Sequence, residues 1–279
     1  MGEGQFAAKR FAATFEATNP TKGWYCTKAN CDGKPHGTWT EPHARAAQHP
    51  PQLFIEGVAR IWLIMAGRGF GKTRSGAEWI AGQARKYPNS EWAVLAPTFK
   101  DLKEICIEAL MEVLAEDKVQ YNRSSLEIVL PTGAKIRSYS AEAPERVRGP
   151  NLSGAWLDEI AQSQLSYPQA YKQLSMAIRK RGSPVQLVAT TTPDGQSKLV
   201  REFTSRQDNS VCITKGSTFD NRDNLADEFI AEVEERHKGT RWERQEIYGE
   251  LLEDVPGALW SPAMIERNKM EMPPDAPKF

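Results

Sequence analysis

The stretch that decides the fold is Ala66-Gly67-Arg68-Gly69-Phe70-Gly71-Lys72-Thr73. It follows the apolar run 61–65, which predicts a buried strand, and it precedes 75–81, which predicts the first turns of a helix. A strand, a glycine-rich loop and a helix in that order form the context of a phosphate-binding loop. The glycines let backbone N–H groups turn towards phosphate oxygens, and the helix N-terminus adds a favourable dipole. The stretch therefore predicts a site for a nucleoside triphosphate, with ATP as the expected ligand.

Two side chains of this loop have expected roles. Lys72 is placed to reach the β- and γ-phosphates, and the Thr73 hydroxyl is placed to bind Mg²⁺. Ala66 stands where the motif usually has its first glycine, and a small residue fits that position. A glycine-rich turn that binds nothing is the alternative, but Gly-Lys-Thr occurs at the expected offset in the expected context.

Length and composition set broad limits. The chain has 279 residues, 40% of them hydrophobic, and its formal net charge is zero. This length suits one large α/β domain with an extension, or two small domains. A neutral chain must meet any nucleic acid through a local basic surface. No apolar run reaches the roughly 18–20 residues of a membrane span, and the four cysteines do not resemble a disulfide framework, so we expect a reducing cytoplasm.

Strands and helices are expected to alternate from Trp62 onwards, which predicts a parallel sheet covered on both faces. The expected strands are 61–65, 92–96, 154–158, 185–190 and 211–215, and the expected helices are 72–86, 98–116, 197–206 and 224–237. The segment 126–139 predicts a β-hairpin with a glycine-containing turn. The predicted organisation is an N-terminal extension over 1–50, a P-loop ATPase domain over 51–255 and a proline-rich linker over 256–279.

Two adjacent acids, Asp158 and Glu159, end the apolar segment 154–157. Asp158 is expected to hold the metal through its water shell, and Glu159 to polarise the water that attacks the γ-phosphate. Acids at a strand end are common by chance, but an upstream phosphate loop makes this assignment specific.

Arginines and threonines complete the candidate site. Arg146 and Arg148 lie in a loop with proline and glycine, where an arginine can project to a neighbouring subunit or simply face solvent. Thr190, Thr191 and Thr192 end another apolar strand, where hydroxyls can sense the γ-phosphate, although β-branched residues also favour strands in general.

Together these motifs resemble the ATPase domain of the large terminase subunit of tailed bacteriophages, which packages double-stranded DNA. The resemblance covers most of 44–260. It rests on the segments 67–79, 140–149 with 157–159, 189–193, and 241–260. It implies a RecA-like P-loop NTPase fold of the ASCE type, α/β, with a central mostly parallel sheet flanked by helices.

The resemblance also implies roles for single residues. Arg68 looks like the loop arginine that the family ties to its catalytic glutamate or to nucleotide state. Arg148, eleven residues before Glu159, matches the trans-acting arginine finger. Thr191 and Thr192 match the motif that couples hydrolysis to DNA movement. Gln48 is similar to the glutamine near adenine, although Gln52 competes for that role.

The implied partners are double-stranded DNA, the portal of a procapsid, a small terminase subunit and further copies of the chain in a ring, in the host cytoplasm. An isolated domain is expected to be monomeric and slow. Large terminases normally continue into a nuclease domain, and no nuclease activity is expected of this chain, which stops at Phe279. Two other functions stay open: a helicase-like DNA translocase, and a docking module whose conformation is controlled by nucleotide.

A cluster in the extension suggests a second metal site. The cluster consists of Cys26, Cys31, His36 and His43. Successive members are five, five and seven positions apart. They could hold one tetrahedral Zn²⁺, but the spacing is not that of a familiar zinc knuckle, so an unligated loop is the alternative. The run 179–181 is a basic loop suited to duplex phosphates or to solvent, and Trp92 and Trp156 are expected in the core.

Overall fold

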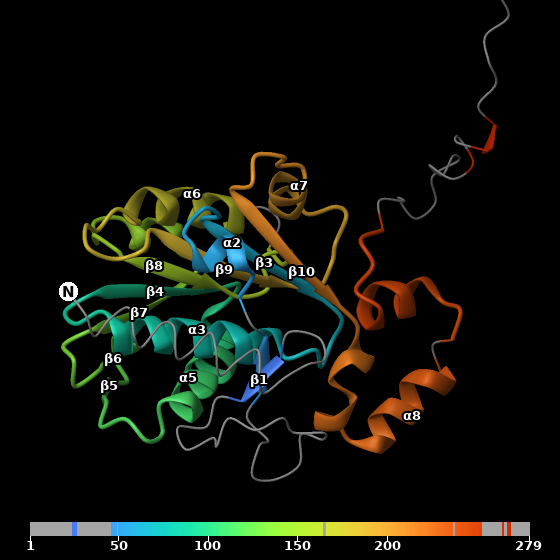
Figure 1. Cartoon of the computed structure of the whole chain (residues 1–279), viewed down its shortest axis with the longest axis horizontal. Helices are drawn as coiled ribbons and strands as arrows, with labels where there is room; N and C mark the ends of the chain where they lie inside the picture. Colours follow the sequence, from blue (N-terminus) through green and yellow to red (C-terminus); the bar gives the residue numbers. More distant parts are fainter. Residues whose placement is uncertain are drawn as a thin grey trace, which may run out of the picture.

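The computed structural model describes residues 24–26, 46–48, 50–163, 166–236, 238–252, 264 and 267–268. An eight-stranded sheet forms the centre of the chain, in the order β10-β3-β9-β8-β4-β7-β6-β5 (Figure 1). Its strands are β3 Ile61–Ala66, β4 Glu91–Ala96, β5 Gln120–Asn122, β6 Glu127–Val129, β7 Lys135–Ser140, β8 Gly154–Leu157, β9 Gln186–Thr191 and β10 Val211–Gly216. A separate antiparallel pair joins β1 Trp24–Cys26 to β2 Ala46–Gln48.

The sheet is mostly parallel, which confirms the predicted fold class. The six strands from β10 to β7 pair in parallel, and β7, β6 and β5 pair antiparallel. The five predicted strands are confirmed, with ends that differ by at most one residue. The predicted hairpin is confirmed as β6 and β7, and its turn contains Gly133 with a φ of 77°. The short strand β5 extends this hairpin and was not predicted.

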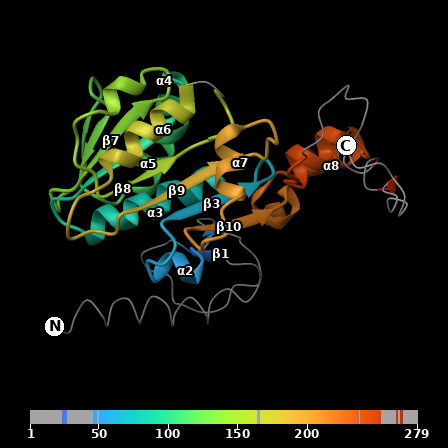
Figure 2. The same ribbon diagram turned by 90° about the horizontal axis from the view of Figure 1, so that it is seen from above.

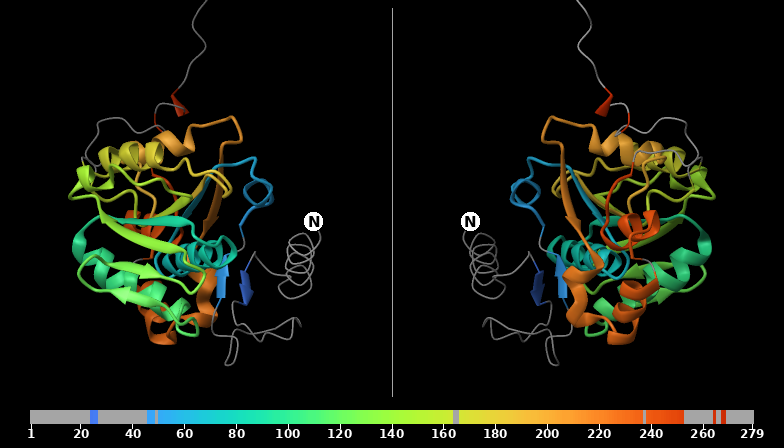
Figure 3. Two further views of the ribbon diagram at one scale, coloured as in Figure 1. Left: turned by 90° about the vertical axis from the view of Figure 1, so that its left-hand side faces the viewer. Right: turned by 90° about the vertical axis from the view of Figure 1, so that its right-hand side faces the viewer.

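Helices cover both faces of the sheet (Figure 3). One layer contains α3 Lys72–Lys86, α4 Phe99–Asp101, the π-helical segment η1 Leu102–Ile107 and α5 Glu108–Val113. The other layer contains α6 Ser166–Ala177 and α7 Lys198–Thr204, above the sheet in Figure 1 with the short α2 Gln52–Ile55. The prediction of 72–86 is confirmed, whereas the predicted helix 98–116 is divided into three segments, and α6 was not predicted.

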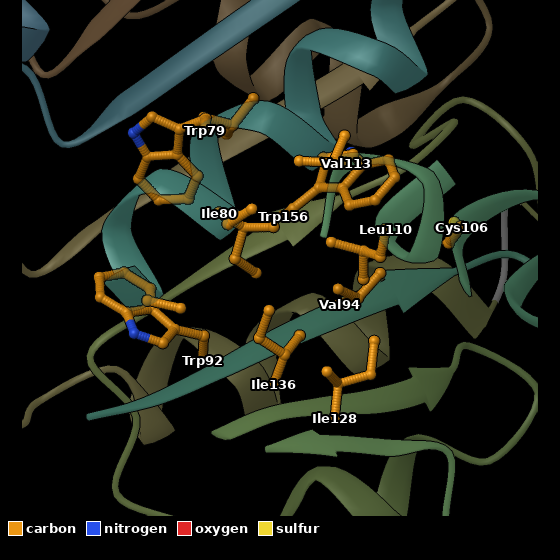
Figure 4. Packing of buried hydrophobic residues seen from close by; sticks show 14 of the residues in the cluster. Trp79, Ile80, Trp92, Val94, Cys106, Leu110, Val113, Ile128, Ile136 and Trp156 are labelled. Carbon is orange, nitrogen blue, oxygen red and sulfur yellow. The ribbon is translucent and has the colours of Figure 1, made fainter. Parts of the chain in front are cut away.

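The central strands are buried on both faces, and their sequences are therefore continuously apolar. Along β3, Trp62, Ile64 and Ala66 enter the cluster under α3 and α5, whereas Ile61, Leu63 and Met65 enter the cluster under α6 and α7. Side chains from several elements meet in the first cluster, as Figure 4 shows for Ile80, Val94, Leu110, Val113, Ile128 and Ile136 among others.

Four tryptophans lie in the first cluster, and three of them, Trp79, Trp92 and Trp156, join α3 to the sheet. Trp92 and Trp156 are fully buried, which confirms their prediction as core residues. Trp79 of α3 meets Trp92 edge-on, with ring centroids 5.9 Å apart. The indole Nε1 of Trp156 lies against Gly76 so closely that a Cβ atom there would overlap it. Helix α3 is therefore packed directly on β8.

The segments after β10 gather beyond the carboxyl ends of the strands, drawn in orange in Figures 1 and 2. They are the 3-10 helix η3 Thr218–Asn224, α8 Asp227–Arg236 and the π-helical segment η4 Glu243–Ile247. Among the described helices, none is both long and apolar enough to cross a membrane. The predicted boundaries at 50 and 255 remain predictions.

Candidate functional site

Strand register brings the predicted site residues to one edge of the sheet. Met65 of β3 pairs with Thr191 of β9, and Leu157 of β8 pairs with Ala189 of β9. The glycine-rich loop, the threonines and the two acids follow or end these three adjacent strands. Because parallel strands share a carboxyl edge, residues more than a hundred positions apart in the chain meet there.

The loop after β3 has the backbone that a phosphate-binding loop requires. Gly69 and Gly71 have φ angles of 72° and 90°, in the left-handed region that glycine adopts without strain. Helix α3 begins at Lys72, directly after Gly71. The amide groups of its first turn have no partners within the helix, so they are donors for an anion.

Lys72 is folded back over the loop. Its Nζ donates to the carbonyl oxygens of Ala66 at 2.9 Å and Gly67 at 3.0 Å, and the residue is 6% exposed. Burial lowers the pKa of Lys72, and the nearby acids, Glu159 first, act in the opposite direction. A buried ammonium next to loop amides favours a polyanionic ligand.

Glu159 meets both the loop and β9. Its Oε1 lies 3.8 Å from the Lys72 Nζ, and its Oε2 accepts a 3.1 Å hydrogen bond from the backbone amide of Thr192. Lys72 also donates to the Thr192 Oγ1 at 3.2 Å. Glu159 has a φ of 47°, which is uncommon for a residue with a side chain. The structure therefore brings together Lys72, Glu159 and Thr192, three of the residues that the sequence analysis placed in the candidate site.

Asp158 is held in the interior beside this group. It is 2% exposed, and its Oδ1 accepts a 2.7 Å hydrogen bond from the Thr190 hydroxyl. Burial, reinforced by the charge of Glu159, raises the pKa of Asp158 to about 7. A carboxylate with this environment gains from a nearby cation, and with the half-buried Thr73 at the start of α3 it fits the oxygen donors that Mg²⁺ prefers.

Two contacts of this group were not singled out by sequence reasoning. Thr190 is the partner of Asp158, whereas the individual roles predicted from the sequence fall on Thr191 and Thr192. Tyr167, on the unpredicted α6, donates from its buried hydroxyl to the carbonyl oxygens of Asp158 at 2.7 Å and Leu95 at 2.8 Å. Thr191 accepts from the amide of Ala161 at 3.2 Å, so it holds the backbone that follows Glu159.

Arg68 pairs with a residue far along the chain. Its Nε lies 2.6 Å from the Oε2 of Glu246, and this hydrogen bond raises the pKa of Arg68. Glu159, the partner that the family resemblance suggested, adds a weaker electrostatic attraction. Glu246 was not predicted, because 178 residues separate it from Arg68.

Arg148 lies away from this group, on the surface. It follows the 3-10 helix η2 Pro144–Val147 and is exposed, as is Arg146. It lines a hollow of about 340 Å³ with Glu145, Gln169 and Lys172. None of the hydrogen bonds or ion pairs described for the phosphate loop involves Arg148, and its predicted role in trans remains a prediction.

The remaining predicted residues are placed as follows. Gln48 lies on β2, and its side chain is outside the described part. The predicted zinc ligands also fall outside it, apart from the backbone of Cys26 in β1. Within the described ranges, no cluster of three or more His, Cys, Asp or Glu residues is arranged to hold a metal ion. The basic residues Arg179 and Lys180 bond through their amides to the Leu152 carbonyl, which places them at the opposite, amino edge of the sheet.

Comparison with known proteins identifies relatives of this architecture. Residues 63–267 match the family described as "Terminase large subunit, T4likevirus-type, N-terminal". The comparison with curated proteins returned no match. Among solved structures, the large terminase ATPase domain of Thermus phage P74-26 is 18% identical with a TM-score of 0.54, covering 74% of this chain and 95% of that one.

Two longer structures are also similar. The large terminase of a thermophilic bacteriophage is 16% identical with a TM-score of 0.58, covering 70% of this chain and 48% of that one. The large terminase of bacteriophage HK97 is 14% identical with a TM-score of 0.59, covering 87% of this chain and 55% of that one. At these identities the likeness concerns the fold, and this chain spans about half the length of those two proteins.

Proposed function

The chain belongs to the family of large terminase subunits, and from that premise we propose that it is an ATPase that drives double-stranded DNA into a phage procapsid. The observation that carries the proposal is the convergence of Lys72, Glu159 and Thr192 within 3.8 Å at the end of three parallel strands. The large terminase of the thermophilic bacteriophage has been solved with ADP and with ATP-γ-S, which supports a nucleotide as the ligand here.

Each residue has a chemical task in this proposal. The loop amides and Lys72 bind the β- and γ-phosphates, and Thr73 and Asp158 hold Mg²⁺, which neutralises charge on the phosphates. Glu159 orients a water and accepts its proton as the oxygen attacks the γ-phosphorus. The bond between that phosphorus and the β-γ bridging oxygen breaks, and ADP and phosphate leave.

Thr192 links this chemistry to the rest of the sheet. Its amide donates a hydrogen bond to the carboxylate of Glu159, and its hydroxyl accepts one from Lys72. One residue at the end of β9 therefore contacts both the proposed base and the proposed phosphate-binding lysine. Loss of the γ-phosphate changes the charge that Lys72 faces, and Thr192 is placed to pass that change to β9. We assign coupling to Thr192 first and to Thr191 as its backbone support.

The trans-acting role of Arg148 requires neighbouring copies. We propose a ring around DNA in which Arg148 of one copy approaches the γ-phosphate held by the next, with the portal and a small terminase subunit as further partners. The exposed position of Arg148, beside a hollow that could receive a neighbouring surface, supports this arrangement.

The test combines binding and turnover. Calorimetry with ATP-γ-S and Mg²⁺ should give saturable binding to the wild-type chain and strongly weakened binding to Lys72→Ala. Phosphate release from ATP should be slow for the chain alone and should rise with double-stranded DNA and procapsids. A chain that binds nucleotide without hydrolysing it under any of these conditions would instead be a docking module.

A further inference from the structure

Two segments that follow the last strand of the sheet contact the phosphate loop. We define the clasp as residues 216–225 and 243–250. Thr218 donates from its hydroxyl to the Arg68 carbonyl, and Asn221 donates from Nδ2 to the Gly69 carbonyl, both at 2.6 Å. From the other segment, the carbonyl of Glu246 accepts a 2.7 Å hydrogen bond from the Arg68 amide. The loop backbone is therefore held by residues that follow the sheet.

The packing between clasp and loop is close. A Cβ atom at Gly67 would overlap the carbonyl oxygen of Ile247, and one at Gly69 would lie 3.0 Å from the Leu225 side chain. Gly249, with a φ of 66°, lies against the Gly67 amide in turn. Because these atoms are in close contact, a shift of the clasp should also displace the backbone of Gly67–Gly69.

Arg68 stands between two carboxylates. It contacts Glu246 directly, and it is attracted electrostatically by Glu159. The Arg68 side chain is 66% exposed whereas that of Glu246 is only 14% exposed, so the guanidinium is the partner that a ligand arriving from solvent can reach. A triphosphate on the loop would add several negative charges and strong acceptor oxygens beside Arg68.

We propose that Glu246 is a positioning residue of the hydrolysis site, which holds Arg68 away from the triphosphate until bound nucleotide competes for it. This inference rests on the proposed function and deepens it. The guanidinium leaves Glu246 for the phosphates when nucleotide binds, and the clasp loses its ion pair with the loop in the same step. The Arg68–Glu246 pair therefore favours the nucleotide-free state. The apparent affinity for nucleotide is lower than the intrinsic affinity, because only chains in which the pair is open are competent to bind with Arg68 on the phosphates.

The test is the Glu246→Gln variant, which keeps the size of the side chain and removes its charge. Arg68 is then free before nucleotide arrives, so KM for ATP should fall by about threefold, the scale of an ion pair with one exposed partner, while kcat changes by less than about twofold. Glu250→Gln is the matched control, because Glu250 pairs with Arg244 at 2.7 Å in the same segment and contacts no loop residue through that pair. It should leave KM unchanged.

A double-mutant cycle separates this role from a general effect on the clasp. In an Arg68→Ala background, Glu246→Gln should no longer change KM, because the partner is gone. An unchanged KM in the single variant, or an equal change with and without Arg68, would overturn the proposal. If Glu246→Gln does not fold, Glu246→Asp keeps the charge, shortens its reach and should lower KM by a smaller factor; an unchanged KM would count equally against the proposal. Absence of both ATP-γ-S binding and hydrolysis in the wild-type chain would contradict the proposed function itself.

Discussion

The backbone amide of Thr192 donates a 3.1 Å hydrogen bond to the carboxylate of Glu159. Glu159 follows β8 and Thr192 follows β9, so this contact joins the ends of two neighbouring strands. The Thr192 hydroxyl also accepts a hydrogen bond from Lys72 at 3.2 Å. The proposed base, the proposed phosphate-binding lysine and the adjacent strand thus all contact one residue. A site built in this way keeps its geometry before the substrate arrives.

Glu159→Gln should abolish hydrolysis and spare binding. The amide keeps the shape of the side chain but cannot accept the proton of the attacking water, so the hydrolysis rate should fall by about 10²–10⁴-fold. Phosphate release and ATP-γ-S calorimetry measure the two properties separately. Glu104→Gln is the control, because Glu104 forms an exposed pair with Lys100 on a helix surface. Turnover retained in Glu159→Gln would remove Glu159 from the role of base.

Gly76→Ala should destabilise the fold, and Gly82→Ala in the same helix should not. Alanine is the better helix former by about 1 kcal/mol, but a Cβ at Gly76 would overlap the Trp156 indole, and overpacking costs about 1–3 kcal/mol or more. No atom lies within 4 Å of a Cβ at Gly82, so that variant should gain up to about 1 kcal/mol. Urea unfolding of both variants checks the opposite signs. A stabilised Gly76→Ala chain would mean that α3 and β8 separate easily.

Asp158→Asn should raise stability more at high pH than at low pH. The folded pKa of Asp158 is raised from 3.8 to about 7, so the folded state binds the proton more tightly than the unfolded state does. The contribution of this carboxyl group to the free energy of unfolding is fully present below its unfolded pKa, where it is protonated in both states. That contribution is lost as pH rises through about 7. The raised pKa then lowers the free energy of unfolding by on the order of 4 kcal/mol at about pH 8, and by about 1–2 kcal/mol at about pH 5, where the group is ionised mainly in the unfolded state.

Urea unfolding of the wild type and Asp158→Asn at these two pH values, without Mg²⁺, measures this difference. The gain from asparagine should be larger at about pH 8 by on the order of 2 kcal/mol. An equal gain at both values would show that Asp158 stays ionised throughout.

Arg148→Ala should affect only assembled chains. Arg148 is exposed and is proposed to act on the nucleotide of a neighbouring copy, so hydrolysis by dilute monomers should be unchanged, whereas turnover with procapsids and DNA should fall by about 10³-fold or more. Arg146→Ala is the matched control from the same turn and should retain packaging-stimulated turnover. Loss of activity in dilute monomers, or in both variants alike, would count against a role in trans.

The sequence predicted the parts of the fold that depend on local patterns. The loop, α3 and the apolar strands were predictable because glycine spacing and buried-strand composition are local. Helix α6 was missed because Pro168 and two tyrosines interrupt its pattern, although proline is tolerated in a first helical turn. The region 98–116 was predicted as one helix, and nothing in its residues distinguishes the π-helical turn within it.

The contacts of the candidate site also divide into those that a local sequence pattern predicts and those that depend on the whole fold. Lys72, Asp158 and Glu159 were predictable because each follows a strand that ends at a known edge. Thr190 and Tyr167 support Asp158 through strand order and a helix crossing, which depend on the whole fold. Glu246 meets Arg68 only because η4 returns to the loop after the sheet is complete. Such long-range pairs leave no periodic mark in one sequence.

The contact between Gly76 and Trp156 has a mechanical consequence. It joins the helix that carries the phosphate loop to the strand that carries the two acids, with no space for one to slide over the other. In hydrogen-exchange terms, the amides of α3 and β8 should open together as one cooperative unit, near the free energy of global unfolding. Any motion that accompanies hydrolysis in the proposed motor should then arise at a hinge outside that unit, and the turn that follows β10 at Gly216 is one candidate position.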